Sequence, residues 1–240
     1  MQTRVRVSSC LLAAVSLMAA LAPGASAGRP GGGSTSSCSL PATDTCTDFV
    51  SKGRRWSNLP IPYYVNVGQA PAGAELDIQD AFSAWENEVK SASVEALYPG
   101  DRSRLDFVYM GTTSALGARD GKNVVYFTPS SGSASVTLAA KGGQLTEFDM
   151  VLNANWSWST DLTCPAHSCG TVDVQNVVTH EVGHVIDLYH VTGSANSLQT
   201  MYPYPADPAK RSTNDWSDEV VKRDLSAGEI LAVRKAYPAT

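Results

Sequence analysis

The eleven residues His180 to His190, HEVGHVIDLYH, decide the fold of this 240-residue chain, and the rest of the sequence is best understood from them. His180 and His184 are four residues apart, so on an α-helix their imidazoles share one face, about one turn from each other. That spacing is typical of a pair of zinc ligands. Glu181 is placed to reach a water on the metal without being a ligand, as the general base of a zinc hydrolase is.

The third histidine, His190, requires the helix to end before it. On a continuing helix, six residues at about 100° each would turn His190 away from the other two imidazoles. We therefore expect the helix to end near Asp187 and the chain to fold back. The sequence predicts one zinc ion with His180, His184 and His190 as its ligands.

The HExxH motif with a third histidine six residues on resembles the zinc motif of the metzincin endopeptidases. Met201 follows eleven residues after His190, in the sequence MYP, and resembles the methionine of the family's Met-turn. The resemblance implies that Met201 lies beneath the three imidazoles as a supporting residue and not as a ligand. Astacins and serralysins have a metal-reaching tyrosine where this chain has Pro203, which favours the matrixin family.

The resemblance to matrixins extends over about residues 56–237, through the segments RWSNLPIPYYV, AFSAWENEV and FDMVLNANWSWS. It implies an α+β, metzincin-like catalytic domain in residues 56–240. In such a domain a twisted mixed β-sheet packs against two long helices, and a small C-terminal subdomain ends in a helix. The implied function is that of a secreted zinc-dependent endopeptidase, which hydrolyses peptide bonds of proteins through a zinc-bound water activated by Glu181.

Asp187 stands where the family usually has glycine. The turn needs left-handed backbone geometry, which Asp adopts more readily than most residues with a Cβ. One interpretation is that Asp187 is tolerated there at a cost of roughly 1 kcal/mol. The other is that its carboxylate has a bond of its own, to a backbone N–H of the turn or to a ligand imidazole.

Hydrophobic periodicity predicts the remaining elements. Apolar residues at spacings of four and three, from Ile78 to Val89, predict a helix over Ala74–Ala92. The zinc helix is expected to start near Asp173, and Ser226 with Glu229 forms a capping box for a closing helix within Leu225–Tyr237. Strands are expected at Ile61–Val67, Leu105–Met110, Val124–Phe127, Val136–Ala140 and Leu145–Asn153.

The N-terminal segment has the pattern of an exported protein. Residues 1–27 have a basic start, an apolar stretch and an Ala-Ser-Ala cleavage site, and predict a signal peptide. Residues 28–55 begin with a Gly/Ser-rich stretch and are expected to be flexible. In a secreted chain the four later cysteines predict two disulfides, and spacing favours Cys38–Cys46 and Cys164–Cys169 over the two other pairings.

Charge and composition limit the classes of molecule that the chain is expected to bind. Loss of two arginines with the signal peptide changes the formal net charge from −5 to −7, so nucleic-acid binding is disfavoured. After the signal peptide no stretch is long and apolar enough to span a membrane. We expect a monomer that acts on a protein or peptide substrate. Asp- and Gly-rich loops are compatible with calcium, which stays unassigned, and His167 is expected at the surface.

Two rival functions stay open at this stage. In a gluzincin-type peptidase the third ligand would be a downstream acid such as Glu219 in place of His190. A non-enzymatic zinc module is the other, although a closed structural site needs no base such as Glu181. In a peptidase, we expect an extended substrate to add to the sheet edge formed by Ser135–Ala140.

Overall fold

The computed structural model describes residues 48–88, 102–160, 171–193, 196, 199–203 and 221–239. Several predictions fall on other residues and therefore stay predictions. These concern the signal peptide 1–27, the linker that follows it, Cys38, Cys46, Cys164, Cys169, His167 and Glu219.

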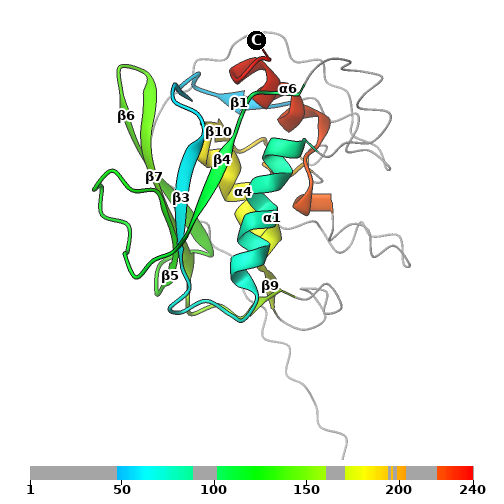
Figure 1. The fold of residues 1–240 in the computed structure, drawn as a ribbon. Coiled ribbons are helices and arrows are strands. Elements are labelled where there is room, and N and C mark those ends of the chain that lie inside the picture. Colours follow the sequence, from blue (N-terminus) through cyan, green and yellow to red (C-terminus); the bar gives the residue numbers. More distant parts are fainter. Residues whose placement is uncertain are drawn as a thin grey trace, which may run out of the picture.

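A six-stranded mixed sheet forms one layer of the described chain (Figure 1). Its strands follow the order β2-β7-β5-β3-β4, all parallel, and β6 pairs antiparallel with β7. The predicted strands are found with shifts of one or two residues at their ends. They are β3 (Ile61–Asn66), β4 (Phe107–Thr112), β5 (Val124–Thr128), β6 (Ala134–Lys141) and β7 (Gln144–Asn153).

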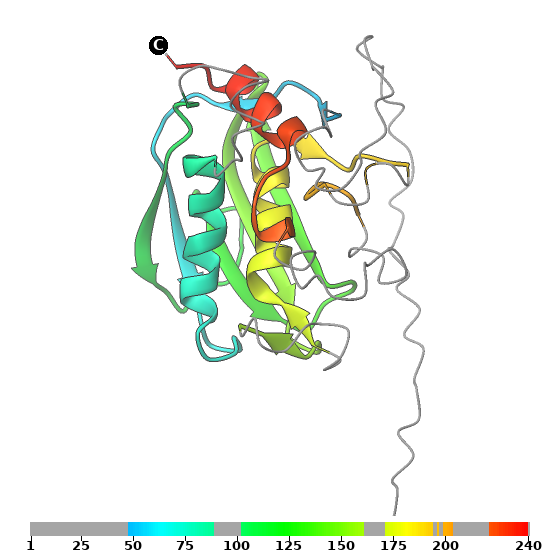
Figure 2. The ribbon, with the colours of Figure 1, turned by 90° about the vertical axis from the view of Figure 1, so that its right-hand side faces the viewer.

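Three α-helices are described, and two of them lie side by side over one face of the sheet (Figure 2). These are α1 (Ala74–Asn87) and α4 (Val174–Val185). Asp173 caps α4 by accepting a hydrogen bond from the backbone N–H of Asn176 at 2.6 Å, as the sequence predicted for the start of this helix. The closing helix α6 (Ala227–Ala236) has the predicted capping box between Ser226 and Glu229.

Helix α1 ends at Asn87, earlier than the predicted Ala92, and the prediction was wrong there. Glu88 has a left-handed φ of 46°, which cannot continue a helix. Its wholly buried carboxylate accepts hydrogen bonds from the backbone N–H of Ser103 and from Arg234 Nε at 2.6 Å. The bonds of Glu88 to residues far along the chain therefore decide where α1 ends, although the apolar periodicity continues beyond it.

Short strands tie the N-terminal residues to the rest of the fold. β1 (Val50–Ser51) pairs antiparallel with β10 (Leu188–Tyr189), and β2 (Arg55–Trp56) joins the sheet beside β7. Residues 50–51 and 55 are therefore paired with the rest of the fold, although the predicted catalytic domain begins at residue 56. A further pair of short strands, β8 (Trp158–Ser159) and β9 (Val172–Asp173), precedes α4.

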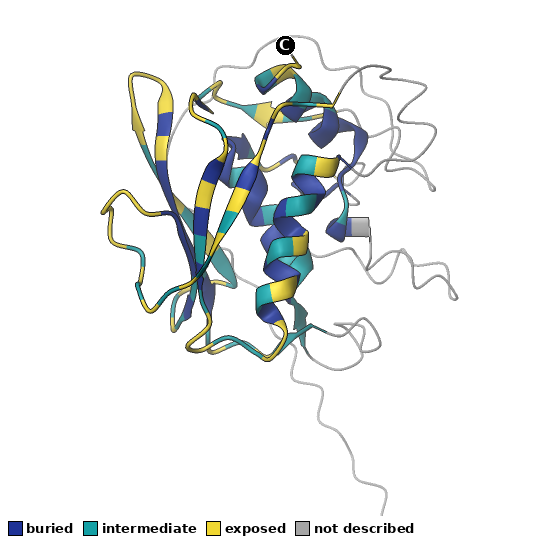
Figure 3. Cartoon of the chain, in the orientation of Figure 1, coloured by how far each residue is buried: buried dark blue, intermediate teal, exposed yellow. Residues whose placement is uncertain are grey.

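The core lies between the sheet and the two helices, where buried residues gather on the facing surfaces (Figure 3). Tyr63 and Phe82 stack with ring centroids 4.0 Å apart, and Phe107 meets Phe82 edge to face. Trp85 of α1 is wholly buried, and its Nε1 donates to the carbonyl of Thr179 in α4 at 2.8 Å. This hydrogen bond attaches α4 to α1 at Thr179, the residue directly before His180. Among the described residues, no helix has the length and hydropathy needed to cross a membrane.

The capping box of α6 yields a test of the fold. Ser226→Ala should lower the free energy of unfolding by about 1 kcal/mol, because the start of α6 loses the hydroxyl that caps it. Urea unfolding of the two proteins measures the difference. An unchanged midpoint would mean that the capping box contributes nothing to stability.

Candidate metal centre

The structure brings the three predicted histidines together. The Nε2 atom of His190 lies 3.0 Å from Nε2 of His180 and 3.2 Å from Nε2 of His184. His180 and His184 are half-buried on α4, whereas His190 is exposed just after β10. Among the described residues these three form the one group of His, Cys, Asp and Glu side chains close enough to hold a metal ion.

Two backbone carbonyls set the tautomers of the helical histidines. Nδ1 of His180 lies 2.6 Å from the carbonyl oxygen of Thr200, and Nδ1 of His184 lies 2.7 Å from that of Leu188. A carbonyl oxygen can only accept, so both Nδ1 atoms carry the proton and donate. The Nε2 atoms of these two rings therefore have free lone pairs, which are directed towards His190.

The protein environment keeps the imidazoles neutral. Burial, followed by the charges of the other two histidines, lowers the pKa of His180 well below its usual 6.5. Burial also lowers the pKa of His184, and it lowers that of His190 to about 4, with smaller contributions from His184 and Lys222. Neutral imidazoles are the form that binds a metal, so protons compete little with a cation at neutral pH.

The donor set fits a divalent cation such as zinc. Three nitrogens around a tetrahedral zinc, each at about 2.0–2.1 Å, would be separated by about 3.3 Å, close to the observed spacing of the Nε2 atoms. Lone pairs that face one another without a shared cation or proton repel. Imidazole nitrogens are also the donors that zinc prefers among neutral side chains, which makes these three residues suited to hold it.

Glu181 lies on α4 directly after the first histidine, and its carboxyl group is buried. One of its oxygens, Oε2, has no hydrogen-bond partner among the described residues. Burial raises the pKa of Glu181 to about 8. A cation nearby would favour the charged carboxylate and lower this pKa again. Oε2 is therefore not used in a hydrogen bond within the described part of the chain.

Met201 packs tightly against the helix that carries the first two histidines. It is 1% exposed, and its Sδ and Cε atoms occupy the space that a side chain at Gly183 would need. Gly183 lies between His180 and His184, and Trp85 Cζ2 closes the same space at 3.0 Å from an added Cβ. The backbone N–H of Met201 donates to Glu229 Oε1 at 3.0 Å, which ties this turn to α6. Its predicted place beneath the imidazoles stays a prediction.

The backbone reverses at Asp187 as the ligand spacing required. Helix α4 ends at Val185, and Asp187 has a φ of 68°, in the left-handed region. The side chain of Asp187 is wholly buried. Its carboxylate does have bonds of its own, but the donors include neither the turn's backbone nor a ligand imidazole. Three of the bonds come from residues 52 and 54, more than 130 positions away, and the hydroxyl of the nearby Tyr189 donates to Oδ1 at 3.4 Å.

Sequence reasoning missed two kinds of residue at this centre. The first kind is the backbone carbonyls of Thr200 and Leu188, which orient the imidazoles. A backbone acceptor cannot be recognised from the pattern of side chains in a sequence. Arg54 was also missed. Asp187 could have indicated a partner of this kind, because a carboxylate that is buried in a turn needs a cation or several N–H donors.

Comparison of the chain with models of protein families and with curated proteins finds no match to either.

The pKa of Glu181 predicts how the metal-free protein responds to pH. A carboxyl whose pKa is about 8 when folded and about 4.5 when unfolded binds its proton more tightly in the folded state. Its stabilising contribution is complete below the unfolded pKa and is lost as pH rises through 8. Relative to the wild type, Glu181→Gln should therefore gain up to roughly 4 kcal/mol between about pH 5 and about pH 9. Urea unfolding of chelator-treated protein at the two pH values measures this, and a parallel pH dependence in both proteins would contradict the assignment.

The contact of Gly183 with Met201 predicts an overpacking effect. Gly183→Ala should destabilise the protein by about 1–3 kcal/mol, because the new methyl group displaces Met201 from a site bounded by Trp85. In a Met201→Ala background the same change should cost less, since the Sδ and Cε atoms of Met201 are removed and only Trp85 Cζ2 stays close to the new methyl group. Thermal or urea unfolding of the four proteins completes this double-mutant cycle. Equal costs in both backgrounds would show that Met201 does not fill this space.

Proposed function

We propose that the chain is a secreted zinc-dependent endopeptidase of the metzincin type, closest to the matrixins, with His180, His184 and His190 as zinc ligands and Glu181 as general base. The observation that carries the proposal is the buried Glu181 carboxyl, unpartnered at Oε2, which follows a ligand histidine directly in a three-histidine centre. A structural zinc site has four protein ligands and needs no such acid. With three ligands, one position is left for water or substrate.

Zinc held by these imidazoles would supply Lewis acidity, both to a peptide carbonyl and to a water whose pKa falls towards neutrality. The chain supplies the proton transfer. Glu181 accepts a proton from the attacking water at its carboxylate and passes it to the nitrogen of the departing amine. Its raised pKa in the metal-free protein reflects the enclosure that also keeps bulk water from competing for this proton.

The free edge of β6 supports the proposal of a peptide substrate. Among the described strands, β6 pairs with β7 alone, so its second edge is available for hydrogen bonding to an extended chain. Helix α4, which carries His180 and His184, contacts β6. A substrate strand added along residues 135–140 would therefore pass close to the helix of the metal centre. Main-chain pairing of this kind explains why we propose a protein or peptide substrate.

Several features favour the matrixin type over its rivals. His190 reaches the other two histidines, which favours it as third ligand over a downstream acid. The mixed sheet, the two helices over one face and the buried Met201 agree with what the resemblance implies. Secretion and a monomeric state are part of the proposal and depend on the sequence of residues 1–27 and on the chain's charge.

Glu181→Ala tests the proposal. This variant should bind zinc as tightly as the wild type and lose most of its hydrolysis, a factor of about 10² or more, because the base is not a ligand. Casein digestion with and without a chelator measures the activity, and metal analysis after dialysis measures bound zinc.

His190→Ala is the matched variant for a ligand. It should lose both zinc and activity. If Glu181→Ala released zinc, the role of Glu181 as base would be wrong, and if the wild type bound zinc but cleaved neither casein nor gelatin, a non-enzymatic zinc module would be the better assignment.

A further inference from the structure

We propose that residues 48–56, here called the N-terminal clamp, hold the metal-binding turn in place, with Asp187 and Arg54 as positioning residues for the third ligand. The inference rests on the zinc site of the proposed function. It explains why an aspartate occupies a left-handed position that glycine would fill without strain.

The carboxylate of Asp187 is almost fully used by the clamp. Its Oδ2 accepts hydrogen bonds from the backbone N–H groups of Lys52 at 3.1 Å and Arg54 at 2.9 Å. Its Oδ1 accepts from Arg54 Nε at 2.8 Å, and Arg54 Nη2 lies 2.6 Å away. A wholly buried carboxylate that is held by two backbone N–H groups and by both Nε and Nη2 of one guanidinium has one stable orientation, so it fixes the geometry of the turn.

Arg54 also reaches past Asp187 to the residue beside the third ligand. Its Nη2 donates to the hydroxyl of Tyr189 at 2.8 Å, and Lys52 Nζ lies 4.4 Å from the centroid of the same ring. The ring of Tyr189 packs at an angle against that of His184, with centroids 6.5 Å apart. The clamp therefore contacts both Asp187 and Tyr189, the residues three and one positions before His190.

Main-chain pairing adds a second attachment. Val50 and Ser51 of β1 pair with Tyr189 and Leu188 of β10. Leu188 supplies the carbonyl that accepts the Nδ1 proton of His184. Strand pairing thus holds in place the acceptor that orients a ligand imidazole, as a hydrogen-bond partner outside the ligand set commonly does in metal sites.

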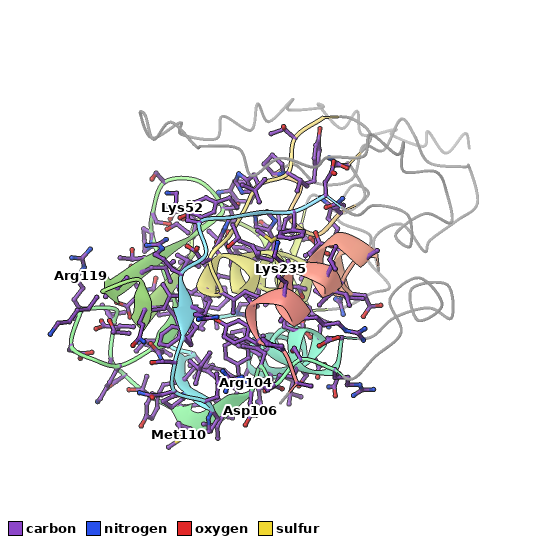
Figure 4. All side chains as sticks on the ribbon, turned by 90° about the horizontal axis from the view of Figure 1, so that it is seen from above. Lys52, Arg104, Asp106, Met110, Arg119 and Lys235 are labelled. Carbon is purple, nitrogen blue, oxygen red and sulfur yellow. The ribbon has the colours of Figure 1, made fainter. Side chains whose placement is uncertain are left out.

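The end of α4 is held by the same segment. Trp56 Nε1 donates at 2.9 Å to the carbonyl of Val185, one of the carbonyls that a helix leaves unpaired at its C-terminus. At the other end of the clamp, Asp48 accepts a hydrogen bond from Asn196. Figure 4 shows the segment in blue, with Lys52 labelled, running past α4 towards α6, where Lys235 lies 5.6 Å from the Phe49 ring centroid.

The test measures zinc affinity of the full chain by competition with a chelator of known affinity. Arg54→Met keeps the aliphatic stem but removes the guanidinium from Asp187 and Tyr189. It should raise the zinc dissociation constant about 10-fold or more, the effect typical of removing a residue that orients metal ligands. The absorption spectrum of the cobalt-substituted protein should change as well, because the position of His190 shifts. Arg54→Lys keeps the charge and should recover part of the loss.

The chain offers a matched control in its second buried ion pair. Arg234 Nε lies 2.6 Å from Oε2 of Glu88, which is wholly buried and also has a positive φ, and the pair joins α6 to the end of α1. Arg234→Met should destabilise the fold comparably and leave the zinc dissociation constant and the cobalt spectrum unchanged. If both methionine variants changed zinc affinity equally, the effect would be one of global stability and the proposal would be overturned.

Asp187→Gly covers the case in which Arg54→Met does not fold. Glycine removes the left-handed strain and leaves no buried unpaired carboxylate, yet the clamp predicts weaker zinc binding by about 10-fold. Unchanged affinity in this variant would overturn the proposal. The two proposals fail separately. A wild type that binds zinc but cleaves no protein contradicts the peptidase and not the clamp, whereas an active enzyme whose affinity is insensitive to Arg54 and Asp187 contradicts the clamp alone.

Discussion

Three imidazole nitrogens have to meet at one point, and a single helix can supply only two of them. This constraint governs the central part of the structure. Helix α4 has to stop at Val185, the chain has to reverse through a left-handed residue at 187, and β10 has to run back far enough to bring His190 within about 3 Å of the other two rings. Because a reversed turn has few internal bonds, neighbouring segments have to hold it, and the N-terminal strands and the Met201 turn both do so.

The helices and strands whose apolar residues recur with a regular period could be predicted from the sequence. Alternating or continuous apolar residues gave the five longer strands, and helical spacing gave α1, α4 and α6. The start of α4 near Asp173 and the capping box of Ser226 with Glu229 were predictable because these signals are local, within a few residues of the helix start. The grouping of the three histidines was also predictable from the motif, since the spacing of His180 and His184 places them on one helix face and the position of His190 requires the helix to end before it.

What could not be predicted depends on partners far apart in the chain. Two-residue strands such as β1 and β10 have no periodicity to detect, and the end of α1 was set by pairs that Glu88 forms with residues beyond it. The orientation of the imidazoles was hidden as well, because it comes from the main-chain carbonyls of Thr200 and Leu188. At Asp187 the sequence raised the possibility that the carboxylate has hydrogen bonds of its own. The donors suggested were the turn's backbone and a ligand imidazole, whereas the donors found are Lys52 and Arg54, far along the chain, and the hydroxyl of Tyr189.

The distance along the chain between Arg54 and Asp187, 133 residues, also bears on the order of folding. Contacts of such high sequence separation form late, since most of the loop they close has to be organised first. An emerging or partly folded chain would present His180 and His184 on a nascent helix before the reversal at 187 is fixed. If the proposed zinc binds here, its third ligand would be placed late in folding, and acquiring the ion would be coupled to completing the tertiary structure.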